Sequence, residues 1–296
     1  MGRNVLAAAI FAALNLTPTV GLSHELVAAG AARGAGQIDS EHLFGFTEGT
    51  DIGHKGDREL ELEAEDRSGK RGGRYNVLGF TAEGKFSLTD DFRIAPGFSL
   101  VRHDISGVPG FLDRSATEFE GAHLEMKYRV LDRARGPFGL TLAATPRVSR
   151  VDEASGALTT EYGADFLVSA DKEVVPGTLF AAANLRYGPS AVREGGVWMH
   201  ESELEVSGAL AVRMPPRLFV GGEVRYRVAY EGLALNRFAG EGVFIGPTLY
   251  ARLSERAWIA GAWSAQIAGH ARREPGSLDL TNFERHEFKV RFGHEF

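Results

Sequence analysis

The chain has 296 residues, of which 44% are hydrophobic and 24% are charged, so it is long enough for one sizeable domain. Its 33 lysines and arginines are outnumbered by 39 aspartates and glutamates, and we therefore expect no nucleic-acid partner. Cysteine is absent, which excludes disulfides and thiolate metal sites.

The first residues have the pattern of an export signal. Arg3 supplies a positive charge, and residues 5–16 form an apolar run that suits a signal-peptide core but is too short to cross a bilayer as a helix. An N-terminal core helix is the alternative. We assign residues 1–36 to a signal peptide with a lead of small residues, and the mature chain is expected to begin between residues 21 and 37.

The rest of the chain repeats one pattern, in which apolar residues alternate with polar ones and turn residues divide the stretches. This pattern is typical of transmembrane β-strands, and no apolar run is long enough for a membrane helix. The sequence predicts an all-β fold, an antiparallel transmembrane barrel with an even number of strands. The twelve predicted strands are residues 57–66, 74–88, 92–104, 117–131, 137–151, 159–171, 178–187, 201–213, 218–230, 243–253, 257–270 and 282–296.

A soluble β-sandwich would show the same alternation, but the lengths of the predicted connections favour a barrel. Every odd-numbered connection is longer than every even-numbered one, as expected for long extracellular loops and short periplasmic turns. Aromatic residues near strand ends fit interfacial girdles, namely Tyr75, Phe92, Phe138, Tyr187, Tyr230 and Trp258. Pro96, Pro146 and Pro247 fall inside predicted strands, where we expect β-bulges.

Charged residues occupy the strand faces opposite the apolar side chains and are expected to line the lumen, because ionised groups in lipid are costly. Closure of the barrel pairs the acidic first strand with the basic last strand, so we predict salt bridges across this seam, each contributing about 1 kcal/mol or less in lumen water. The predicted lumen charges are Glu59, Glu61, Glu63, Glu65, Glu125, Lys127, Arg129, Glu203, Glu205, Glu223, Arg225, Arg227, Lys289 and Arg291.

The C-terminal segment carries a family resemblance. Phe288, Val290, Phe292 and the terminal Phe296 alternate along the last nine residues. This arrangement resembles the C-terminal signature of Gram-negative outer-membrane β-barrels, although His294 departs from the aromatic or apolar residue usual at its position. The resemblance implies location in the outer membrane and recognition of the last strand by the barrel-assembly machinery.

Residues 42–56 resemble the N-terminal segment of a group of uncharacterised proteobacterial barrel proteins, a resemblance that implies no known activity. Residues 37–56 are therefore treated as an N-terminal periplasmic segment or plug, and residues 57–296 as the barrel. As function, the segment is interpreted as a periplasmic strap or lumen plug. The alternative is a flexible lead into the first strand, which its glycines favour.

Catalytic patterns are not evident. No Gly-x-Ser-x-Gly elbow or His-Glu-x-x-His helix occurs. His123 beside Glu125, and His200 beside Glu201, could each position a base, but they are interpreted as ordinary lumen and rim residues because no nucleophile matches them. His103, His270 and His286 share no metal-ligand spacing, so we predict no catalytic residue, metal or cofactor.

These observations favour a narrow passive channel or solute-transport barrel with weak ionic selectivity, because inward acids and bases nearly balance. A lipid-modifying outer-membrane enzyme and a structural barrel with a filled lumen are the alternatives. The expected partners are outer-membrane lipid, lipopolysaccharide, the barrel-assembly machinery and small solutes.

Overall fold

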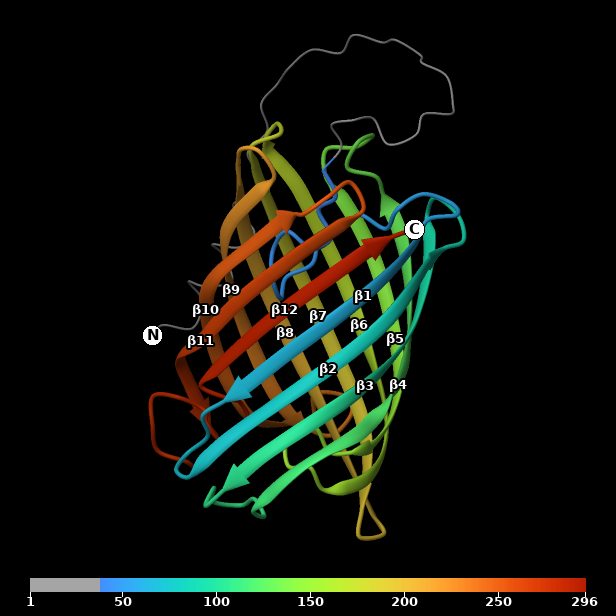
Figure 1. The fold of residues 1–296 in the computed structure, drawn as a ribbon. Helices are drawn as coiled ribbons and strands as arrows, with labels where there is room; N and C mark the ends of the chain where they lie inside the picture. Colours follow the sequence, from blue (N-terminus) through green and yellow to red (C-terminus); the bar gives the residue numbers. More distant parts are fainter. Residues whose placement is uncertain (1–37) are drawn as a thin grey trace, which may run out of the picture.

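Twelve antiparallel strands close into one barrel in the computed structural model, which describes residues 38–296 (Figure 1). Each strand pairs with its neighbour in sequence, and β1 pairs with β12 to complete the closure. The strands are β1 (Arg58–Ser68), β2 (Arg74–Ser87), β3 (Phe92–Ser106), β4 (Arg114–Leu131), β5 (Gly139–Val151), β6 (Leu158–Val175), β7 (Leu179–Glu194), β8 (Val197–Met214), β9 (Leu218–Glu231), β10 (Arg237–Arg252), β11 (Ala257–Ala271) and β12 (His286–Glu295). The predicted fold is confirmed; the predicted signal peptide lies outside the described residues.

The burial pattern of the barrel is the reverse of that of a soluble protein. On β1, Leu62 is 46% exposed, whereas the adjacent Glu61 is only 6% exposed. Alternate residues of a strand point to opposite faces, so the apolar side chains form the outer surface and the charged ones line the interior. Within residues 38–296, none of the helices has the length and apolar character needed to span a bilayer.

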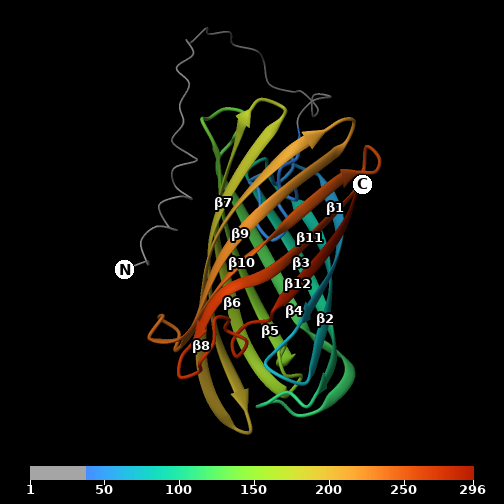
Figure 2. The same cartoon turned by 90° about the vertical axis from the view of Figure 1, so that its left-hand side faces the viewer.

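Five of the six predicted long connections are shorter than the sequence pattern suggested, and the sixth, between β11 and β12, is longer. The predicted loop at residues 188–200 is wrong, because β7 and β8 continue through it and are joined by the two-residue turn Gly195–Gly196. Both glycines have positive φ, which suits such a hairpin turn. This hairpin extends far beyond its neighbours at the end of the barrel opposite the C-terminus (Figures 1 and 2). Loop length therefore does not separate the two ends as cleanly as predicted.

The predicted bulges at the strand prolines are also wrong. Beside Pro96 the β2–β3 pairing skips from Glu83–Gly97 to Phe86–Ile94 without a change of register. Pro146 and Pro247 interrupt the pairing with one neighbouring strand in the same way. Because proline lacks only one N–H, it weakens the ladder on a single side, and the remaining pairs hold the register.

Two of the predicted girdle aromatics lie inside the barrel. Tyr75 and Trp258 are buried, and each belongs to an apolar cluster within the lumen. The Trp258 cluster lies near the chain's C-terminus, which marks the periplasmic end of an outer-membrane barrel; the Tyr75 cluster lies toward the opposite mouth. Tyr75 shares the phase of the inward Glu83 and Lys85 on β2, and Trp258 that of the buried Ser264 and Gln266 on β11, so the alternation indicates their side better than strand-end position does.

Candidate functional site

Residues 38–54, which we call the lumen segment, lie inside the barrel at the end that carries the C-terminus (blue in Figure 1). Leu43 and Phe44 are almost fully buried and pack in the apolar cluster that contains Phe180, Phe219 and Trp258. This buried, packed arrangement differs from the flexible lead into the first strand that the glycines of the segment favoured. The segment is compact because its polar groups find partners on many strands, which its local sequence does not reveal.

Two side chains of the wall hold the backbone of the lumen segment. The Glu223 carboxylate accepts hydrogen bonds from the N–H groups of Phe46 (3.0 Å) and Thr47 (2.9 Å) and from the Thr47 hydroxyl (3.1 Å). Asn184 accepts a bond from the Glu48 N–H (2.6 Å) and donates one to the Glu48 carbonyl (2.9 Å). Strands β9 and β7 therefore satisfy buried backbone groups that would otherwise be costly.

A third anchor surrounds the guanidinium group of Arg133, in the β4–β5 turn. Arg133 donates to the Ile38 carbonyl (2.9 Å), to Asp51 (2.8 Å) and to Asp171 of β6 (2.5 Å). The hydroxyl of Thr50 also donates to Asp171 (2.5 Å). Burial raises the pKa of Asp51 to about 6. Arg133 acts to lower this pKa, and the nearby carboxylates of Asp39 and Asp171 act to raise it.

The acidic side chains of the lumen segment meet basic side chains of the wall. Glu41 contacts Arg93 (2.6 Å) and Lys127 (3.0 Å), and Glu48 contacts the same Lys127 (2.9 Å) and Arg186 (3.4 Å). Burial would raise the pKa of both carboxyl groups, but the surrounding cations outweigh it and hold each pKa well below its usual range. The segment is therefore docked by charge pairs as well as by apolar packing.

His42 lies beside a cluster that has the ligand types of a metal site. Its ring nitrogens and the carboxylates of Glu59 and Glu61 offer atoms within 4.8 Å of one another. However, the Lys85 ammonium group contacts His42 (3.1 Å), Glu59 (3.3 Å) and Glu61. A fixed cation already neutralises these carboxylates, so the cluster is better suited to an ion-pair network than to a metal ion.

The closing seam contains the predicted salt bridges. Glu63 pairs in register with Arg291 and Glu65 with Lys289, and their side chains meet at 2.6 Å and 2.9 Å. The Arg291 and Glu63 side chains are only 9% and 21% exposed. They are more enclosed than the solvated pairs we expected, because the lumen segment and neighbouring side chains exclude water.

The remaining predicted lumen charges fall into separate groups. Glu125 contacts Arg93 (2.8 Å). Arg129 lies nearer the end of the barrel that carries the C-terminus and contacts Asp91 of the β2–β3 turn (3.3 Å). Across the lumen the charges of β8 and β9 meet the acid Glu287 of β12. This second group contains Glu203, Glu205, Arg225, Arg227 and Glu287.

Four of the residues that organise the lumen were missing from the predicted site set: Glu41, Glu48, Lys85 and Glu287. Lys85 and Glu287 were detectable, because each keeps the alternating phase of the inward charges on its strand. Glu41 and Glu48 had no such signal, since the lumen segment has no periodicity of two.

The candidate bases lack a nucleophile. His123 contacts Glu83 (2.5 Å) across β2 and β4, and His103 contacts the Glu153 carbonyl (2.9 Å). His270 and His286 stack on aromatic rings, and His200 lies on the exposed part of the β7–β8 hairpin. Within residues 38–296, no serine or threonine hydroxyl is hydrogen bonded to a histidine ring.

The predicted assembly residues lie on the outer face of β12. Phe288 and Phe292 are exposed in the apolar outer band, and Val290 shares their phase. Phe296 follows the end of the strand, and its N–H donates to the Arg58 carbonyl (3.0 Å) beside β1. These four residues present one apolar edge at the closing seam.

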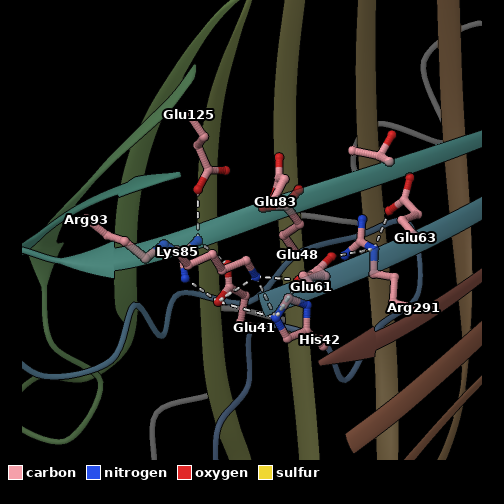
Figure 3. A pocket seen from close by; sticks show the side chains of 11 residues that line it. Glu41, His42, Glu48, Glu61, Glu63, Glu83, Lys85, Arg93, Glu125 and Arg291 are labelled. Atoms are coloured by element: carbon pink, nitrogen blue, oxygen red, sulfur yellow. Dashed lines mark hydrogen bonds and ion pairs between the residues drawn. The ribbon is translucent and has the colours of Figure 1, made fainter. Parts of the chain in front are cut away.

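Two hollows remain beside the lumen segment along the wall formed by β1 to β4. The larger leaves about 100 Å³ of space for water-sized molecules, and Figure 3 shows the side chains that line it. The smaller leaves about 30 Å³ by the same measure and lies toward the C-terminal end of the barrel. Charged side chains form most of both linings, so the hollows suit water, ions or small polar solutes better than apolar ligands.

The closed twelve-stranded wall, with apolar side chains outside and charged ones inside, is the fold of the outer-membrane β-barrels. The chain belongs to a family of unknown function, DUF6662, whose model matches residues 36–296. No curated protein sequence matches the chain.

Solved structures share this fold. An outer-membrane channel from Pseudomonas putida F1 superposes with a TM-score of 0.55 and 12% sequence identity, covering 83% of this chain and 98% of that one. The β-domain of the Bordetella autotransporter BrkA gives a TM-score of 0.52 and 12% identity, covering 82% of this chain and all of that one (100%). At this identity the similarity extends to the fold and not to the activity.

Proposed function

We propose that this chain is an outer-membrane barrel that acts as a narrow passive channel for small polar solutes. The observation that carries the proposal is the pair of charge-lined hollows left between the lumen segment and the wall. A barrel that served only as a membrane anchor would need no such space. Twelve strands enclose more room than side chains alone fill in an eight-stranded barrel, but less than a porin channel of sixteen strands.

The lumen segment limits the size of the solute. It occupies the periplasmic half of the barrel and contacts β2, β3, β4, β6, β7, β9 and β11, so solutes have to pass beside it or displace it. The outer-membrane location, export by the N-terminal signal, contact with lipopolysaccharide and recognition by the barrel-assembly machinery belong to the same proposal. The apolar outer band and the C-terminal aromatic edge support them.

A structural barrel with a filled lumen is the second candidate, and the burial of the lumen segment favours it. Planar-bilayer recording of the purified full chain separates the two. The channel proposal predicts small, ohmic conductance steps. Complete silence at high protein-to-lipid ratio would support the structural role, and large steps of porin size would contradict a lumen narrowed by residues 38–54.

A further inference from the structure

The two hollows are separated by a small set of side chains that lines both of them. Glu41, Lys85 and Arg93 belong to the linings of the larger and the smaller hollow alike. We propose that these three residues form the barrier of a cation-preferring pathway along the wall of β1 to β4. This inference rests on the proposed channel function and specifies its route and its class of solute.

The positions of the lining residues along β1 give the order of the pathway. The smaller hollow is lined by Arg58 and Glu59, at the start of the strand, and the larger by Glu61 and Glu63, further along it. Lys85 pairs in register with Glu59. The hollows therefore follow one another along the barrel axis, and the three shared residues lie between them.

Ion pairs hold the barrier closed. The Arg93 guanidinium bridges Glu41 (2.6 Å) and Glu125 (2.8 Å), and the Lys85 ammonium contacts Glu41 (3.7 Å), Glu59 and Glu61. Figure 3 shows Lys85 and Arg93 extending from one side toward Glu41 of the lumen segment. Glu41 is thus the contact through which the lumen segment closes the route.

Acidic groups outnumber basic ones on both sides of the barrier. The larger hollow is lined by Glu41, Glu48, Glu61, Glu63, Glu83 and Glu125 against Lys85, Arg93, Arg291 and His42. The smaller is lined by Asp39, Glu41, Asp57, Glu59 and Glu295 against Arg58, Lys85 and Arg93. An excess of carboxylates within low-dielectric walls raises the local concentration of cations. We therefore infer that the pathway prefers cations. The charge balance of the whole lumen had predicted only weak ionic selectivity.

Partly exposed charged side chains lie on β5 to β7, beside Glu48 of the larger hollow. Arg147 and Asp165 face the lumen on β5 and β6, and their side chains are 29% and 30% exposed. Arg186 of β7 is 37% exposed and contacts Glu48, which also lines the larger hollow. In the proposed pathway these side chains lead from the outer mouth to the hollow past Glu48, and the barrier at Glu41 is the next obstacle toward the periplasmic end.

The first test is the reversal potential of single channels in a KCl gradient. The full chain should prefer K⁺ to Cl⁻, and the double variant Glu83→Gln/Glu125→Gln should reduce that preference by about half or more. Lys85→Met should raise the conductance by about twofold or more, since it removes a barrier cation. Arg227→Met, which removes a lumen cation that lines neither hollow, is the matched control and should leave the conductance nearly unchanged.

Anion preference, or equal conductance of Lys85→Met and Arg227→Met, would overturn the inference while leaving the channel function in place. A second readout does not depend on conduction. Because the chain has no cysteine, Thr81→Cys gives one thiol in the larger hollow, and Thr160→Cys gives one on the outer face. The reagents are trimethylammonioethyl and sulfonatoethyl methanethiosulfonate.

The ratio of the cationic to the anionic reaction rate should be about tenfold higher at Thr81→Cys than at Thr160→Cys, because the lining concentrates cations. Equal ratios at the two positions would overturn the cation preference. A raised ratio in a barrel that does not conduct would retain the cation preference of the hollow and reject the channel function. Heat-modifiable migration on gels verifies that each variant has assembled.

Discussion

The imidazole ring of His42 stacks on the indole ring of Trp258, with the ring centroids 4.0 Å apart and the planes 15° from parallel. The contact joins the lumen segment to the inner face of β11. Trp258 is 1% exposed, whereas the chain's other two tryptophans, Trp198 and Trp263, are 44% and 43% exposed. Trp258 therefore reports on docking of the segment once the other two are replaced by phenylalanine.

The first prediction concerns Gly45, which has φ of +81° and approaches the wall so closely that an added Cβ would lie 2.7 Å from the Ala262 Cβ. In the single-tryptophan background, Gly45→Val should undock the segment, shift Trp258 emission to the red and raise acrylamide quenching about threefold or more, since water reaches the indole. Gly56→Val is the matched control. Gly56 also has a positive φ (+95°), but no atom would lie within 4 Å of an added Cβ. Equal quenching in the two variants would show that the segment is not packed there.

Docking of the lumen segment should also depend on pH. Because the pKa of Asp51 is raised to about 6, the docked state binds a proton that the released state loses near the usual aspartate pKa. The contribution of Asp51 is therefore most favourable below that usual value and is lost as the pH rises through about 6. Hydrogen exchange of residues 38–54 should be less protected near pH 7.5 than near pH 5, relative to Asp51→Asn at each pH. An identical pH response of both proteins would contradict this assignment.

The seam between β1 and β12 should contribute measurably to stability. The Glu63–Arg291 pair is mostly enclosed, so we expect a coupling energy of about 1–3 kcal/mol, above that of a solvated pair. The double-mutant cycle of Glu63→Gln and Arg291→Gln measures it from the free energy of unfolding in urea with lipid vesicles. A coupling near zero would mean that lumen water screens the pair.

Removal of Phe296 should impair assembly. The residue lies at the exposed aromatic edge of the last strand, and the resemblance to outer-membrane barrels implies that this edge is recognised during insertion. We expect the folded, heat-modifiable form in the outer membrane to fall about severalfold for the truncated chain. Leu249→Ala, on the outer face of β10 and outside the C-terminal signature, controls for a general loss of apolar surface. Normal insertion of the truncated chain would argue against a role in recognition.

Much of the barrel could be predicted because each strand carries its own signal. The alternation on β1 and β12 gave the phase of Glu63 and Arg291, and closure then gave their pairing. The alternation could not give strand ends. Strands β7 and β8 continue past the membrane into a hairpin whose polar and small residues resemble those of a loop.

The lumen segment could not be placed from the sequence, because nothing local specifies its position. The burial of Thr47 depends on Glu223, which accepts its hydrogen bonds. The burial of Glu41 depends on its ion pairs with Arg93 and Lys127. These partners are distant in the sequence and come from different strands. Trp258 was misassigned to the membrane interface for a related reason, since its inner neighbour His42 belongs to that same segment.

Single-channel conductance of Gly45→Val, beside the full chain and Gly56→Val, tests most directly whether the lumen segment narrows a channel. All three are recorded in the same planar bilayers after assembly has been verified on gels. Since undocking removes the main obstruction from a twelve-stranded lumen, we predict small steps for the full chain and for Gly56→Val, and steps about threefold larger or more for Gly45→Val. Equal conductance of all three proteins, or silence of all three, would contradict the account.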